Sequence, residues 1–78
     1  MSFNAKGTMK DLLTSLLKAK KTVYVILNSG KEYVGIILKV EQNLVVLQTQ
    51  GSRNFYDAVI RIEDITAVEV KVRENKKD

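Results

Sequence analysis

The residues in this chain that are best suited to chemistry are lysines near its N-terminal end. Lys18, Lys20 and Lys21 form a tight group, and an ammonium group can bind phosphate as a compact point charge. Residues 1–22 hold five lysines and one aspartate, whereas residues 23–78 hold eight cations and eight anions. The formal net charge of +4 therefore lies entirely in the first 22 residues. Such a segment is either a solubilising surface or a surface that binds phosphate backbones.

Other kinds of chemistry are poorly served by the sequence. The chain has no cysteine and no histidine, so it lacks thiolate nucleophiles, the commonest general base and the commonest metal ligand. No nucleophile elbow or cluster with metal-ligand spacing is present. Glu63 and Asp64 are neighbours on a predicted turn, and nothing indicates that their carboxylates converge. We therefore expect no enzyme activity, no metal and no cofactor.

The length and composition predict a single small domain. The chain has 78 residues, of which 45% are hydrophobic and 28% charged, as in globular proteins. No apolar run approaches the roughly 20 residues of a membrane span, and no signal-peptide pattern is recognisable, so we expect a soluble, cytoplasmic protein without a membrane partner. A core this small contributes only about 3–5 kcal/mol. Without disulfides or metals, subunit contacts are the remaining source of stability, and we expect an oligomer.

The hydrophobic pattern predicts a helix followed by strands. One apolar stripe at the 3.6-residue period places a helix over residues 8–20, formed by Met9, Leu12, Leu13, Leu16 and Leu17. Thr8 and Asp11 have the spacing of a capping box at its start. The pattern then becomes strand-like and predicts five short antiparallel strands, at residues 23–27, 31–40, 44–48, 54–61 and 65–72.

Two of these strands, 23–27 and 44–48, are apolar on both faces, which is typical of strands covered on both sides. In so small a chain, we expect the helix or another subunit to cover the second face. A glycine inside the second strand, Gly35, marks a bend, a bulge or a close backbone approach. The predicted organisation is a flexible N-terminus at residues 1–7, one domain at 8–72 and a flexible charged tail at 73–78.

This order and spacing resemble the Sm-like proteins, which include the LSm and Hfq branches. A hydrophobic-x-Leu-x-x-Gly run occupies residues 25–30, and Gly35, a hydrophobic strand and a polar turn at Glu41 follow it. Residues 60–68 match the frame of the second half of the family signature, and the resemblance extends over residues 8–70. It implies a mostly β fold in which an N-terminal helix precedes a strongly bent five-stranded antiparallel barrel of SH3-like type. It also implies a ring in which the fourth strand of one subunit pairs with the fifth strand of the next.

The chain departs from the family pattern at positions that contact bases. Glu41 replaces the usual aspartate after the second strand, and Asn43 stands where the family usually has a ring that stacks on a base. Val45 stands where the Sm branch has an asparagine that reads uracil, and Ile62 replaces the glycine after the signature arginine. The uridine pocket of the family is therefore largely absent as a motif.

The resemblance nevertheless implies six candidate nucleic-acid-binding residues: Gln42, Asn43, Arg61, Lys18, Lys20 and Lys21. In a ring, the turn with Gln42 and Asn43 would line the central opening, where amides can read base edges but stack poorly; otherwise they are ordinary turn residues. Arg61 either contacts nucleic acid or forms an ion pair with Glu41 or Asp64. The three lysines would lie at the rim of the helix-bearing face.

The resulting functional expectation is an Sm-like homo-oligomeric ring of five to seven subunits that binds single-stranded RNA or DNA, with a role in RNA processing or regulation. Binding would use the basic helix-bearing face and the central pore. The alternative is a structural or adaptor ring that binds protein partners without nucleic acid. The missing stacking residue at Asn43 favours this alternative.

Overall fold

The computed structural model describes residues 8–51 and 55–71. In these residues a helix is followed by five strands, with a 3-10 helix before the last strand: α1 (Met9–Ala19), β1 (Thr22–Leu27), β2 (Glu32–Val40), β3 (Leu44–Thr49), β4 (Asp57–Arg61), η2 (Ile62–Asp64) and β5 (Ile65–Val70). The predicted fold class is confirmed, with each strand close to its expected place. The segments 1–7 and 73–78, which the sequence predicts to be flexible, lie outside the described residues, as do Asn54 and Val72.

Helix α1 has both of its ends closed by hydrogen bonds. At its start the backbone N–H of Asp11 donates to the Thr8 hydroxyl (3.1 Å) and the N–H of Thr8 donates to the Asp11 carboxylate (3.4 Å), which confirms the predicted capping box. At its end Lys20 is the C-cap, in the left-handed conformation (φ 55°, ψ 42°). Its N–H donates to the carbonyl oxygens of Leu16 and Leu17. These caps satisfy backbone groups that the helix itself leaves without partners.

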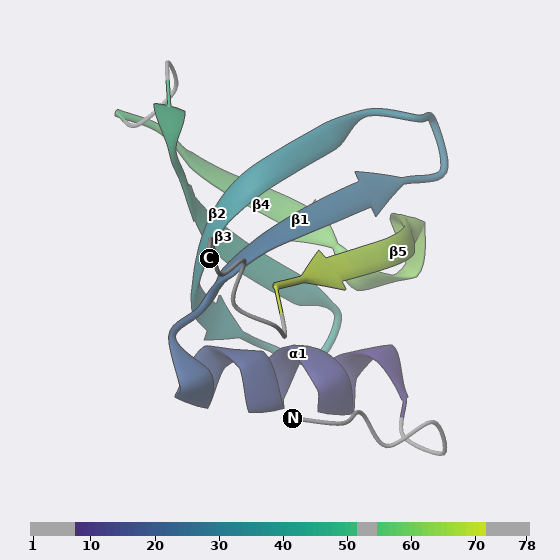
Figure 1. The fold of residues 1–78 in the computed structure, drawn as a ribbon. Helices are drawn as coiled ribbons and strands as arrows, with labels where there is room; N and C mark the ends of the chain where they lie inside the picture. Colours follow the sequence, from purple (N-terminus) through teal and green to yellow (C-terminus); the bar gives the residue numbers. More distant parts are fainter. Residues whose placement is uncertain (1–7, 52–54, 72–78) are drawn as a thin grey trace, which may run out of the picture.

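The five strands form one antiparallel sheet in the order β4-β3-β2-β1-β5. The pairing register shifts between Ile37 and Lys39 on β2, and between Ile26 and Leu27 on β1. Such irregularities increase the local twist and bend the strand, and Figure 1 shows a strongly curved sheet. Strands β4 and β5 are the two edges of this sheet, the same two strands that the resemblance assigns to ring formation.

The core lies on the inner side of the curved sheet, and α1 lies across one end of it (Figure 1). Leu13 and Leu16 of α1 are completely buried against the inward-facing residues of the strands. The buried cluster consists of Leu13, Leu16, Val23, Val25, Ile37, Val45, Leu47, Ile60 and Ile65. The helix therefore docks through the apolar stripe that the sequence predicts, and its other side remains exposed.

In the single chain, the outer side of the two strands that are apolar on both faces is only partly covered. Within a single chain the inner residues of β1 are buried, but Tyr24 between them is 49% exposed. On β3, Leu44 and Val46 are only half-buried, and Val59, paired with Val46, is 63% exposed. The helix packs against the inner side, so it does not cover these residues. Of the two covers that the sequence allows, the helix and another subunit, only another subunit remains as a prediction for the outer side.

The fourth strand begins three residues later than predicted, at Asp57. Before it, the Tyr56 carbonyl oxygen accepts hydrogen bonds from the Thr49 hydroxyl (2.7 Å) and the Thr49 N–H (3.2 Å). Thr49 is buried, whereas Phe55 is 91% exposed. The hydroxyl of Thr49 closes this end of the hairpin, which places the two aromatic residues outside the regular strand.

Candidate nucleic-acid interface

The turn between β2 and β3 carries two of the predicted residues, Gln42 and Asn43. The Glu41 N–H donates to the Leu44 carbonyl oxygen (2.8 Å), which closes the turn. The Asn43 carbonyl oxygen accepts from the Ile62 N–H (2.9 Å), so the turn is tied to η2. The side chains of Gln42 and Asn43 are not used in these bonds, and both residues are exposed. The backbone thus holds the turn while leaving both amides available to a ligand.

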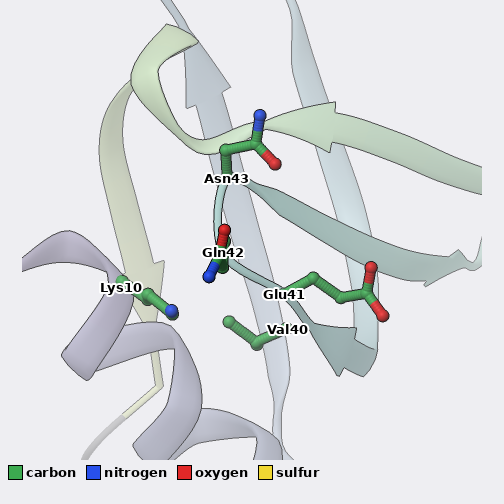
Figure 2. A pocket seen from close by; sticks show the side chains of 5 residues that line it. All are labelled: Lys10, Val40, Glu41, Gln42 and Asn43. Atoms are coloured by element: carbon green, nitrogen blue, oxygen red, sulfur yellow. The ribbon is translucent and has the colours of Figure 1, made fainter.

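A solvent-open hollow of about 550 Å³ lies between this turn and α1. It is lined by Lys10, Val40, Glu41, Gln42 and Asn43. Figure 2 shows Lys10 reaching from α1 toward the turn, and the Glu41 carboxylate pointing away from it. The Glu41 carboxylate instead pairs with Lys39, at 2.9 Å between Oε2 and Nζ. The hollow therefore combines one cation with two amides, a donor set suited to an anionic or strongly polar ligand.

Lys10 is the residue of this hollow that the sequence interpretation missed. It occupies the second position of α1, where the positive end of the helix dipole disfavours a cation. This unfavourable position was the one feature of the sequence that could have marked Lys10 as a candidate, because residues that break a local rule concentrate at functional sites. The sequence alone could not show that the β2–β3 turn lies beside this end of α1.

Arg61 lies at the end of β4, opposite Leu44 of β3, and so close to the β2–β3 turn. Its Nε donates to Asp64 Oδ2 (2.9 Å) and its Nη2 to Asp64 Oδ1 (3.2 Å). Its Nη1 also lies 3.2 Å from Glu63 Oε2. Of the two ion pairs that the sequence left open, the one with Asp64 forms, and Glu41 pairs elsewhere.

The hydrogen bond to Asp64, and then the charges of Asp64 and Glu63, raise the pKa of Arg61 above its ordinary value. Because a raised pKa preserves the charge below that value, Arg61 stays charged at every physiological pH. A contact between Arg61 and nucleic acid would have to displace a bidentate carboxylate. The structure thus favours the ion-pair interpretation for Arg61.

Replacing Arg61 with alanine should change the melting temperature by only a few degrees, because its side chain is 62% exposed and exposed ion pairs contribute little. It should also weaken oligonucleotide binding less than replacing Lys18 and Lys20 together. Thermal unfolding and an oligonucleotide titration of the same preparation would test both statements. A larger loss of affinity than in the lysine variant would show that Arg61 exchanges its carboxylates for phosphate.

The three predicted lysines lie at the other end of α1 from the hollow. Lys18 is in the last turn, Lys20 is the C-cap and Lys21 precedes β1, and all three are exposed. Lys10 and Lys18 are eight residues apart, which corresponds to about 12 Å along the helix axis. The structure therefore divides the predicted set into two groups, one beside the β2–β3 turn and one at the C-terminal end of α1.

Residues 8–51 and 55–71 contain neither a membrane-spanning helix nor a metal site. No helix among them combines the length and the apolar character that a membrane span requires. No group of three or more acidic side chains is arranged as a metal site in the same residues.

Comparison with known proteins gives a likeness in structure but none in sequence. No protein-family model matches the chain, and no curated protein matches it. Among solved structures, the chain is similar to the 1.55 Å crystal structure of the pleiotropic translational regulator Hfq, with a TM-score of 0.70. The two share 17% sequence identity over 90% of this chain and 100% of that chain. The chain therefore has the Sm-like fold that Hfq represents.

Proposed function

We propose that this chain assembles into an Sm-like homo-oligomeric ring that binds single-stranded RNA or DNA through its helix-bearing face and central opening. It would act by collecting strands and not by catalysis. One observation carries the proposal. Lys10, Lys18, Lys20 and Lys21, all on or beside α1, have no ion-pair partner among the described residues. A set of unpaired cations on one element is the electrostatic pattern of a phosphate-binding surface.

Two features support ring formation. Strands β4 and β5 are the edges of the described sheet, and edge strands pair readily with another chain because their outer backbone groups lack strand partners. Apolar side chains also lie at or near the β4 edge: Tyr56 is 61% exposed and Val59 is 63% exposed. We propose that β4 of one subunit pairs with β5 of the next, and that Tyr56 or Phe55 contacts the neighbouring subunit.

Repetition then strengthens binding, because the lysines of each subunit add to one surface. The salt dependence of affinity grows with the number of phosphates neutralised, so a ring binds far better than its subunits. A role in RNA processing or regulation agrees with the similar structure being that of a translational regulator.

The backbone of Lys20 also supports a role for its side chain. Lys20 has a left-handed backbone conformation, which a glycine would adopt at about 1 kcal/mol less cost. The cationic side chain is therefore present despite a local penalty.

Native mass spectrometry tests the oligomeric state. Binding is tested by titration of fluorescent oligo-A, oligo-U and mixed single strands at 50 and 150 mM salt, where the Debye length is roughly 14 and 8 Å. We expect a closed oligomer of five to seven subunits and affinity that falls steeply with salt. A well-folded monomer, or a ring that binds none of the strands at either salt concentration, would overturn the proposed function.

A second function, a protein-binding adaptor ring, is favoured by the outer side of the sheet. Tyr24 and Leu38 are 49% and 46% exposed there, and the hollow has no aromatic ring among its lining residues. An adaptor would purify with a protein partner and show a nucleic-acid-free absorbance ratio. The unpaired lysines of α1 favour the nucleic-acid ring over this second function.

A further inference from the structure

The hollow between α1 and the β2–β3 turn is unsuited to holding a stacked base. Its lining consists of one lysine, one valine, one glutamate and two amide residues. Stacking needs a flat aromatic or guanidinium surface, and none of the lining residues provides one. The nearby guanidinium of Arg61 is engaged by Asp64 and Glu63. A ligand in this hollow must therefore be held by charge and hydrogen bonds.

The charges around the hollow leave one cation without a partner. Glu41 is neutralised by Lys39 at 2.9 Å, and its carboxylate points away from Lys10 (Figure 2). The other carboxylate near this end of α1, that of Asp11, accepts the Thr8 N–H in the capping box. Among the described residues, Lys10 has no ion pair. An anion is thus the ligand that this arrangement lacks.

The helix itself adds to the preference for an anion. The amino end of α1 carries partial positive charge, which disfavours Lys10 but favours a negative ligand beside it. A bound phosphate would interact well with both positive groups and would remove their mutual repulsion. Gln42 also lines the hollow, and its exposed side-chain amide carries N–H donors of the kind that bind phosphate.

We propose that this hollow is a phosphodiester site, in which Lys10 and Gln42 hold a backbone phosphate of the strand without recognising its base. The inference rests on the proposed function, because the phosphate belongs to the bound strand. The hollow is open to solvent and its walls are mostly exposed polar side chains, which suits a backbone that stays solvated. Each subunit of a ring would then neutralise at least one phosphate beyond those met by Lys18, Lys20 and Lys21.

The test uses three single-stranded probes with the same number of phosphates: oligo-U, oligo-A and an abasic oligodeoxyribose phosphate. Lys10→Gln should weaken binding of all three by a similar factor, about three- to tenfold at 100 mM salt, and should lower the salt slope by about 0.7 for each phosphate that the variant no longer neutralises. Lys10→Arg keeps the charge and should retain most of the affinity. The N-terminus of the helix carries partial positive charge, which repels the ammonium group of Lys10. Removing that charge should therefore not lower the melting temperature of Lys10→Gln.

Lys31→Gln is the matched control, because it also removes one exposed positive charge, but from the β1–β2 turn. There the Nζ of Lys31 lies 5.2 Å from the centroid of the Tyr33 ring. If Lys10→Gln binds as tightly as Lys31→Gln, or if it loses affinity for one base only, the phosphodiester site is wrong while the nucleic-acid ring stands. The same conclusion follows if the wild-type protein binds oligo-U and oligo-A but not the abasic strand. If the wild-type protein binds none of the probes, the proposed function fails as well.

Discussion

Replacing Gly35 with alanine should destabilise the protein more than any other change to a described glycine. A β-carbon at this position would collide with the carbonyl oxygen of Gln48 and lie 2.8 Å from its carbonyl carbon. Both atoms belong to the backbone of β3, which the β2–β3 pairing holds in place. Relief of the clash requires the two strands to separate, and overpacking of this kind costs about 3 kcal/mol.

In a domain of this size a loss of about 3 kcal/mol consumes most of the stability and lowers the melting temperature by roughly 12 °C or more. Thermal and urea unfolding at a single protein concentration would measure it. Gly30→Ala is the matched control: its φ is +92°, but nothing lies within 4 Å of the added carbon, so only backbone strain of about 1 kcal/mol is expected. Equal stabilities for the two variants would contradict the close approach of β2 and β3.

Neutralising Lys18 and Lys20 together, as Lys18→Gln/Lys20→Gln, should cause the largest loss of nucleic-acid affinity. Both side chains are exposed at the C-terminal end of α1, and in a ring the change removes two cations from every subunit. Each phosphate of a single strand that is no longer neutralised lowers the salt slope by about 0.7. We expect an affinity at least tenfold weaker at 150 mM salt, roughly the effect of leaving one or two phosphates without a cation, and the same loss for oligo-A, oligo-U and mixed strands.

The control for this variant keeps the charge and the approximate side-chain length. Lys18→Arg/Lys20→Arg should bind nearly as well as the wild type, because guanidinium also binds phosphate. A loss confined to one sequence would mean that these lysines contact bases. Unchanged affinity for every strand would show that these lysines do not bind nucleic acid and only make the surface more soluble.

The two groups of cations have different expected roles. Lys18, Lys20 and Lys21 are exposed at the end of the helix, where, under the proposed function, they would attract a strand from solution over roughly the Debye length of 8 Å at physiological salt. Lys10 lines a hollow together with Gln42, which restricts where a phosphate can sit. The lysine pair should therefore govern the association rate and its salt dependence, and Lys10 the dissociation rate.

Local interactions explain how much of the fold can be predicted. The helix follows from the spacing of its leucines and from the Thr8–Asp11 capping box, which involve residues at most four apart. The strands follow from runs of β-branched residues between polar turns. The sequence pattern places the start of β4 three residues too early, because the hydrogen bonds between Thr49 and Tyr56 join residues from two sides of a hairpin.

Residue types and short-range spacing are enough to define a helix followed by five short strands, with the excess charge in the first 22 residues. That Gly35 marks a close approach to the backbone of Gln48, and that β2 is irregular at Ile37 and Lys39, is decided by the tertiary structure. Nor do residue types and spacing show that Lys10 and Gln42 line one hollow, or that Arg61 binds Asp64 and Glu63 while Glu41 binds Lys39. Folding selects these partners through the curvature and register of the sheet. Any carboxylate can form an ion pair with any cation, and the strength of the interaction depends on the distance between them. The backbone sets those distances and so decides which pairs form.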